Sequence, residues 1–565
     1  MGVVADDDAP PAATARTSDG RWRVMTAAAA AAFALLGVGW ATTKRPAPPA
    51  AAVAAPVATV DVGSTNGEAV AAYRAGVDAL HDASGGTARR NFDRAIALDP
   101  AFAAAHLRKV LATPWVGDAE RESMRKATQL RATLNEHDRA LLHAVEPWVA
   151  VPQDVRDVEA RLAELAKAHQ DPEYFYQLCR FRVLGGKYDR AAEACRAARE
   201  LDSHFAGAFW LEGQSALYTG DTSIGLASLD VCLRLSPTAT SCINDSLQMR
   251  LNEGQCDAAL GDAERLAAIQ PESTSLVDLG IASYGAGKSL VATHAIYERA
   301  IELLPADDSY ARYAIMSRLA VTAGRFDDAL ADIDNWERAV TRSTDEKAHV
   351  DPFIERGWLL REIGREAALV DTARAVLANH SAWSPSVEVD GRIAALVALY
   401  RGGAMSHASF VAERAAILDH VTETPEAGTR GSGAGRRWIA AYADAVVTQQ
   451  DALDAMEALP HYLPLPTDRF RLPSDDESVG AAMLLAGHTE DAISFLTRAA
   501  HSCRAARFPL QYVWSNVELG AAFESTGNIK AACDAYRRIT GRLGNVASSR
   551  SAARATARLL ALGCR

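Results

Sequence analysis

The sequence predicts an all-helical solenoid built from repeated pairs of short helices. Four positions spaced 34 residues apart, Ser203, Pro237, Pro271 and Pro305, each close a stretch that reads as two helices. No sustained alternation of apolar and polar residues rich in Val, Ile and Thr indicates strands. A chain of 565 residues is too long for one compact core, whereas stacked repeats bury a continuous one.

The register of the repeat is set by small residues at fixed positions. If Ala206 is the first residue of a unit, Gly213 falls at position eight, Gly220 at position fifteen and Pro237 at position thirty-two. A small residue at position eight lets the two helices of one hairpin approach closely. The pattern therefore predicts one helix hairpin in each unit, with a turn near position fifteen.

These residues resemble the tetratricopeptide repeat family, whose helix hairpins bury their apolar faces by stacking on one another. The resemblance is clearest over 172–305 and returns over 76–100 and 519–536. The spacing breaks in between, and there we expect loops or longer helices. The breaks lie around 341–351, 381–391 and 423–437. The predicted divisions are an N-terminal solenoid over 67–340, divergent helical repeats over 341–470 and C-terminal repeats over 471–565.

The first 66 residues have a different composition. Residues 1–20 predict a disordered cytoplasmic tail, and residues 46–66 a linker rich in Pro and Ala. Residues 21–45 predict a transmembrane helix, because Val24 to Thr43 is an uncharged run of bilayer length bracketed by basic residues. The alternative is a cleaved signal peptide. Both interpretations send the repeats across the membrane of a bacterial cell.

A second resemblance lies outside the plain repeat pattern. The stretches over 100–113, 134–155 and 165–178 are similar to the region that follows the membrane helix in Ser/Thr protein kinases of myxobacterial type, and the C-terminal run from Ser502 is similar to their tail. The sequence lacks the glycine-rich loop and catalytic-loop motif of the kinase domain. The resemblance implies a periplasmic sensing or docking module at the inner membrane, with no catalytic residues of its own.

Composition and motifs argue against several other functions. The net charge of -12 argues against nucleic acid as a partner, because phosphate binding requires a basic stripe. Gly287, Lys288 and Ser289 fit a relaxed phosphate-loop pattern, but they fall at the turn between two predicted helices, where no strand precedes them. The 14 histidines form no pair with metal-ligand spacing. We therefore expect no cofactor, no metal and no enzyme activity.

The eight cysteines leave two interpretations open. Cys179 and Cys195 occupy positions where side chains from the two helices of one hairpin meet, so a disulfide is possible. The favoured interpretation is that both are small apolar core residues. Cys503, Cys533 and Cys564 are candidates for a further bridge.

The first helix of each unit lines the concave side of a solenoid, at positions two, five, nine and thirteen. An ordinary polar surface is the alternative to a peptide-binding groove. The candidate groove residues are Tyr176, Arg180, Trp210, Gln214, Asn244, Gln248, Asn252 and Asp278. The function expected is a membrane-anchored scaffold or sensor for a protein or peptide. The alternative is a detached sensor module that works with a separate Ser/Thr kinase.

Overall fold

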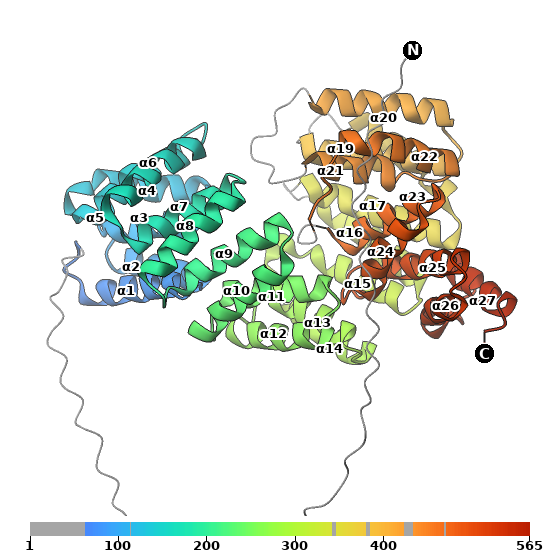
Figure 1. Cartoon of the computed structure of the whole chain (residues 1–565), viewed down its shortest axis with the longest axis horizontal. Helices are drawn as coiled ribbons and strands as arrows, with labels where there is room; N and C mark the ends of the chain where they lie inside the picture. The colour runs from blue at the N-terminus through green and yellow to red at the C-terminus, as the bar shows by residue number, and fades with distance from the viewer. Residues whose placement is uncertain are drawn as a thin grey trace, which may run out of the picture. The chain divides into compact units, whose positions relative to one another are not determined.

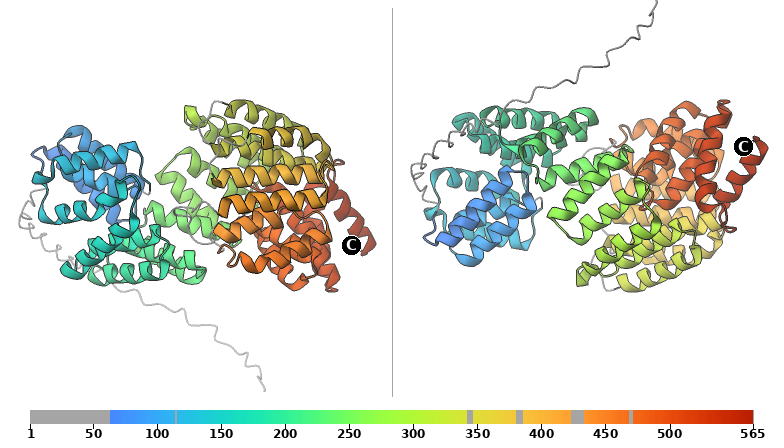
Figure 2. Two further views of the ribbon diagram at one scale, coloured as in Figure 1. Left: turned by 90° about the horizontal axis from the view of Figure 1, so that it is seen from above. Right: turned by 90° about the horizontal axis from the view of Figure 1, so that it is seen from below.

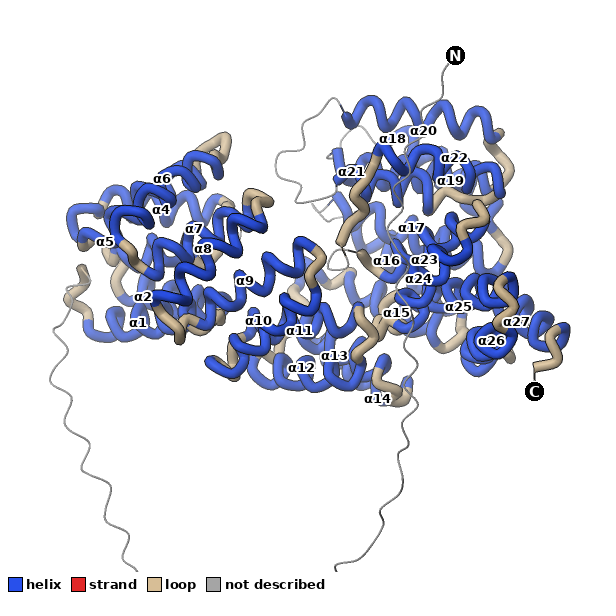
Figure 3. The backbone as a smooth tube through the Cα atoms, in the orientation of Figure 1, coloured by secondary structure: helices blue, strands red, loops and turns tan. Residues whose placement is uncertain are grey.

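A computed structural model describes residues 63–113, 115–341, 346–379, 385–422, 433–467 and 471–564. All regular structure in these ranges is helical (Figure 3). The predicted tail, transmembrane helix and most of the linker lie outside the described residues. Among the helices that are described, none is long and apolar enough to cross a bilayer.

Consecutive helices form antiparallel hairpins that stack on their neighbours (Figures 1 and 2). The first hairpins comprise α1 (Gly67–His81), α2 (Gly85–Leu98), α3 (Ala103–Leu111), α4 (Asp118–Gln129), α5 (Glu136–Val149), α6 (Val155–His169), α7 (Pro172–Leu184) and α8 (Tyr188–Leu201). The middle hairpins comprise α9 (Ala206–Thr219), α10 (Thr222–Leu235), α11 (Thr240–Asn252), α12 (Cys256–Ile269), α13 (Ser273–Gly285), α14 (Leu290–Glu302), α15 (Ala311–Thr322) and α16 (Phe326–Val340).

The remaining helices continue the same arrangement. They are α17 (Glu346–Ile363), α18 (Val370–Asn379), α19 (Pro385–Arg401), α20 (His407–Thr422), α21 (Gly433–Trp438), α22 (Gln449–Ala458), α23 (Pro473–Leu485), α24 (Thr489–His501), α25 (Pro509–Ser525), α26 (Ile529–Leu543) and α27 (Arg550–Ala561). The helices α17 and α19 have 18 and 17 residues, against 13 or 14 in α9 to α14. The longer helices expected near two of the breaks in spacing are therefore present.

Small residues at position eight set the distance between the two helices of a hairpin. If the turn glycines Gly287 and Gly527 are placed at position fifteen, Gly280 and Gly520 stand at position eight. A Cβ atom added to Gly280 would lie 2.2 Å from the ring of Tyr297, and one added to Gly520 would lie 2.5 Å from the ring of Tyr536. Both tyrosines are almost completely buried. The glycine thus makes room for a large ring from the partner helix, which confirms the predicted role of position eight.

Turns between paired helices recur with the same period. Gly186, Gly220 and Gly254, 34 residues apart, all have a positive φ, which places them in the left-handed region that glycine tolerates best. Gly287 and Lys288 form the corresponding turn between α13 and α14. The segment with the phosphate-loop pattern is therefore an interhelical turn, as predicted.

The loops of the C-terminal repeats pack against the hairpin turns of the middle repeats. A Cβ atom on Gly254 would lie 2.7 Å from the carbonyl oxygen of His501, and one on Gly324 would lie 2.5 Å from Val546. Gly364 approaches the side chain of Arg550 in the same way. We call these three glycines the turn row. Because each has a positive φ and no room for a side chain, the turn row fixes how closely the two sets of repeats approach.

All eight cysteines are in disulfides, so the favoured interpretation of Cys179 and Cys195 as unbridged core residues is wrong. The two helices of that hairpin bring their Cα atoms to 5.3 Å, which is within the range of a disulfide. The four bridges are Cys179–Cys195, Cys232–Cys242, Cys256–Cys503 and Cys533–Cys564. The third joins residues 247 positions apart and ties the loop after α24 to the start of α12.

A buried carboxylate joins α17 to the C-terminal helices. Glu362 is 1% exposed and accepts hydrogen bonds from the indole N–H of Trp514, at 2.8 Å, and from the hydroxyl of Ser549, at 2.5 Å. The backbone N–H and the hydroxyl of Ser551 also donate to it, at 3.2 and 2.7 Å. Four donors from α25 and the start of α27 therefore converge on one side chain of α17.

Replacing Gly280 with Ala tests the packing at position eight. We expect Gly280→Ala to lower the free energy of unfolding by about 1–3 kcal/mol, because the new methyl group overlaps the ring of Tyr297. Gly261→Ala is the matched control, because it lies on α12 with no atom within 4 Å of an added Cβ. The control should gain up to about 1 kcal/mol from helix propensity. Equal effects of the two changes on denaturant unfolding would contradict the packing argument.

Candidate functional site

The repeats from α17 onward, called the C-terminal repeats from here on, surround a cavity of about 570 Å³. Its volume lies within the range of roughly 300–1,000 Å³ that is usual for sites that bind small molecules. The charged lining residues are Arg318, Asp351, Glu355, Arg361, Glu366, Asp390, Arg401, Arg436, Arg437, Asp444, Asp475, Glu477 and Arg507. The larger apolar ones are Phe353, Ile354, Trp358, Leu369, Ile393, Val397, Ile439, Leu472, Phe508 and Trp514.

The wall of the cavity is made by the first helices of successive hairpins. If the turn glycine Gly403 is placed at position fifteen, positions two, five, nine and thirteen of α19 are Asp390, Ile393, Val397 and Arg401. All four line the cavity. The same register on α17, α23 and α25 brings in Asp351, Ile354, Trp358, Ser474, Glu477 and Trp514. The cavity is therefore the concave face of the C-terminal repeats.

One side of the cavity carries an arginine stacked on a tryptophan. The guanidinium carbon of Arg361 lies 4.1 Å from the centre of the Trp514 ring. The indole N–H of Trp514 donates to the buried carboxylate of Glu362, which fixes the plane of the ring. The stacked arginine is thus held in place while its N–H groups lie at the cavity, where they can meet a carboxylate.

Two buried polar atoms at the cavity have no partner among the described residues. They are Oε1 of Glu477 and Nε2 of Gln511, and both side chains are 2% exposed. The other carboxylate oxygen of Glu477 accepts only a long hydrogen bond, at 3.4 Å, from the hydroxyl of Ser478. A buried acceptor or donor without a partner costs free energy, which a ligand with complementary groups would recover.

Three of the carboxylates that line the cavity, Glu477, Asp444 and Asp475, have raised pKa values. Burial raises the pKa of Glu477, although the charges of Arg361 and Arg401 act in the opposite direction. Asp444 also lines the cavity, where desolvation by the surrounding protein raises its pKa to about 7. Burial raises the pKa of Asp475 to about 6. A cation that enters the cavity would stabilise the charged forms of these groups.

Arg401 is destabilised as a cation on the same wall. Burial, together with the charge of Arg361, lowers the pKa of its guanidinium to about 9, so it stays protonated at neutral pH. Its Nη2 donates to the backbone carbonyl oxygens of Val446, at 2.8 Å, and Asp444, at 3.4 Å. Both acceptors are neutral, and within the described residues Arg401 forms no ion pair, although the charges of Glu477, Asp444 and Glu366 act on it.

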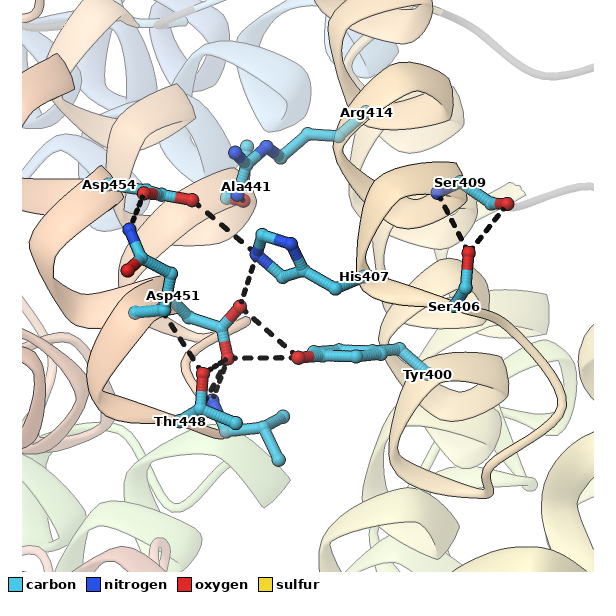
Figure 4. A network of polar contacts seen from close by, with 11 residues as sticks. Tyr400, Ser406, His407, Ser409, Arg414, Ala441, Thr448, Asp451 and Asp454 are labelled. Carbon is cyan, nitrogen blue, oxygen red and sulfur yellow. Dashed lines mark hydrogen bonds and ion pairs between the residues drawn. The ribbon is translucent and has the colours of Figure 1, made fainter.

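A second polar cluster fixes the loop that carries Asp444 (Figure 4). The carboxylate of Asp451 caps the start of α22 and accepts hydrogen bonds from the backbone N–H groups of Val447 and Thr448, at 3.1 and 2.7 Å. Tyr400 donates its hydroxyl to the same carboxylate, and Nε2 of His407 lies 3.1 Å from it. This cluster therefore joins α19, α20 and α22 behind the cavity wall.

The groove predicted on α7, α9, α11 and α13 is occupied by contacts within the protein. Tyr176 is buried against Phe205, and Arg180 donates to the carbonyl of Thr113. Trp210 and Gln214 both donate to Asp245, at 2.7 and 3.3 Å, and Asn244 is half-buried. None of these residues lines the cavity.

The remaining groove residues meet a side chain from the C-terminal repeats. Nε and Nη2 of Arg504 donate to Asn252 and Gln248, at 2.6 and 2.5 Å. Gln248 donates in turn to Asp278, at 3.0 Å. The disulfide Cys256–Cys503 holds this loop against α11 and α12. The structure thus brings Gln248, Asn252 and Asp278 together beneath an internal arginine, and their part in binding a ligand stays a prediction.

The cavity residues were missed because their repeats depart from the 34-residue spacing. The 34-residue period predicts groove positions only in the repeats that keep it. The turn glycines Gly364, Gly403 and Gly487 are visible in the sequence and would have supplied the register for α17, α19 and α23. Counting back from each turn would have identified Arg401 and Glu477 as groove residues.

Comparison with known proteins gives no closer identification. No protein-family model and no curated protein matches this sequence. A chain of the Naa15/Naa10 complex bound to HypK-THB is 12% identical with a TM-score of 0.26, and the match covers 72% of this chain and 64% of that one, less than two thirds. Yeast Tom70 is 12% identical with a TM-score of 0.31, covering 76% and 96%. Likenesses this low support no argument about function.

The raised pKa of Asp444 predicts how stability depends on pH. The pKa of Asp444 is about 3.9 in the unfolded chain and about 7 in the folded protein. Between these values the carboxyl group binds more protons in the folded state than in the unfolded state, so the free energy of unfolding falls as pH rises. Asp444→Asn removes this contribution. We expect the melting temperature of the variant, relative to the unchanged protein, to be higher at pH 8 than at pH 5.

Asp371→Asn is the matched control, because the side chain of Asp371 is 95% exposed. Its melting temperature relative to the unchanged protein should be the same at both pH values. A difference for Asp444→Asn that is independent of pH would show that this carboxyl group titrates alike in the folded and unfolded states.

Proposed function

We propose that this protein is a membrane-anchored, periplasmic repeat scaffold that binds a peptide or a segment of a protein in the cavity of its C-terminal repeats. The observation that carries the proposal is the cavity itself, whose lining residues Glu477 and Gln511 each hold a buried polar atom with no hydrogen-bond partner in the part of the chain that the structure describes. Aromatic walls supply apolar contact area beside these polar groups, as in sites that hold peptides by a few anchor side chains.

The proposed location rests on the disulfides and on the sequence of residues 21–45. Four bridges that use every cysteine are typical of proteins that fold in oxidising compartments such as the bacterial periplasm. The uncharged run between Arg23 and Lys44 is long enough to hold the chain at the membrane. The two observations are independent and favour the same side of the membrane.

The second candidate function is a sensor module that works with a separate Ser/Thr kinase. The three segments that resemble the extracytoplasmic region of such kinases converge on one buried side chain, Arg108 of α3. Its Nη2 lies 2.6 Å from Asp138 of α5, and it also pairs with Glu173 of α7. The three similar segments therefore pack together as one unit of the structure. A common origin of this unit and the corresponding unit of the kinases would support the sensor function.

Labelling of an engineered cysteine tests the location. Val291 is 81% exposed on α14, so we expect Val291→Cys to react with a membrane-impermeant maleimide added to intact cells. Ala263→Cys is the matched control, because Ala263 is fully buried and should react only after denaturation. Reaction of the exposed cysteine only after the cells are lysed would place the repeats in the cytoplasm and contradict the proposal.

A photo-reactive residue tests binding at the cavity. We expect benzoylphenylalanine in place of Trp358 to form a covalent adduct in illuminated cells, because this side chain lines the cavity. The same residue at Val291 is the control and should form none. Peptide mass spectrometry of the adduct identifies the partner. A Ser/Thr kinase in the adduct would favour the second function, whereas equal adducts at both positions would contradict a role for the cavity.

A further inference from the structure

The cavity presents charges of both signs at one place. Glu477 lies on α23, Arg361 on α17 and Arg401 on α19, and all three line the cavity. Arg361 and Arg401 are close enough for their charges to act on Glu477 and on each other. Within the described residues, neither arginine forms an ion pair with Glu477. All three residues therefore line one cavity without pairing with each other.

In the part of the chain that the structure describes, none of these three side chains forms an ion pair. Oε1 of Glu477 has no hydrogen-bond partner among the described residues, and Arg401 donates only to backbone carbonyls. Arg361 contacts the face of Trp514. A ligand with only a positive group would pair with Glu477 and leave the arginines unpaired. A ligand with only a negative group would pair with the arginines and leave Glu477 unpaired. A ligand that carries both groups satisfies both sides of the cavity.

We infer that the cavity binds a short peptide with free termini, whose ammonium group meets Glu477 and whose carboxylate meets Arg361 and Arg401. This inference rests on the proposed function and specifies the class of ligand. The Nε2 group of Gln511 is a donor for a peptide carbonyl oxygen in the same space. Trp358 and Phe508 provide apolar walls for the side chains of the peptide. The volume of about 570 Å³ suits a few residues rather than a folded partner.

Tripeptide mixtures that differ only at their ends test this inference. The probes are an equimolar mixture of tripeptides with free termini, the same mixture N-acetylated, and the same mixture amidated at its C-termini. Binding to the purified full-length protein is measured by native mass spectrometry. We expect each block to weaken binding by at least about tenfold, because each removes one charge-assisted contact between the peptide and the cavity.

Two variants test which residue recognises each charged end of the peptide. Glu477→Gln should abolish the preference for a free over an acetylated N-terminus, and Arg361→Gln should abolish the preference for a free over an amidated C-terminus. The matched controls are Glu490→Gln on α24 and Arg374→Gln on α18, both exposed. These controls should keep both preferences. Because the mixtures are also compared on the unchanged protein, the test does not depend on either variant folding well.

The outcomes separate this inference from the proposed function. Equal binding of the three mixtures, or preferences that survive in Glu477→Gln and Arg361→Gln, would overturn the peptide inference. If the photo-reactive residue at position 358 still formed its adduct, the proposed function would stand with a different ligand. Absence of both the adduct and tripeptide binding would overturn both.

Discussion

The carboxylate of Glu362 is the contact on which the C-terminal half of the structure depends. Each repeat of a solenoid normally contacts only the repeats next to it in the sequence. The carboxylate of Glu362, in contrast, accepts four hydrogen bonds from residues more than 150 positions later in the chain. The contact closes α17 onto α25 and α27, and it orients Trp514, on which Arg361 stacks. The same group of side chains therefore joins α17 to α25 and α27, a contact we call closure, and forms part of the cavity wall.

Closure also explains why the middle repeats offer less free groove than an open solenoid would. Arg504 and its neighbours occupy the concave side of α11, where Gln248 and Asn252 lie, and the disulfide Cys256–Cys503 makes that contact covalent. The concave surface that keeps a cavity is further along the chain, on α17, α19, α23 and α25. The cavity thus lies away from the most regular repeats.

The sequence was sufficient for the helices, the hairpin turns and the packing of glycine against tyrosine, because these depend on residues within one repeat. The cavity depends on contacts between distant repeats, which a local period does not contain. Cys179 and Cys195 illustrate the difference. Because both lie in one hairpin, the sequence alone indicated that a disulfide between them was an option. The pairing of Cys256 with Cys503 depends on the loop after α24 packing against α12, a contact between distant repeats that the sequence does not indicate.

The turn row limits how this protein can evolve. Gly254 and Gly324 each meet a loop of the C-terminal repeats, and Gly364 meets Arg550 at the start of α27. These contacts occur in the same order along both stretches of chain. Duplication or loss of one hairpin is a common change in open repeat arrays. Here it would shift every later glycine of the turn row away from the segment that it contacts. The number of repeats between α11 and α27 is consequently constrained in the way that residue number is constrained within a single globular domain.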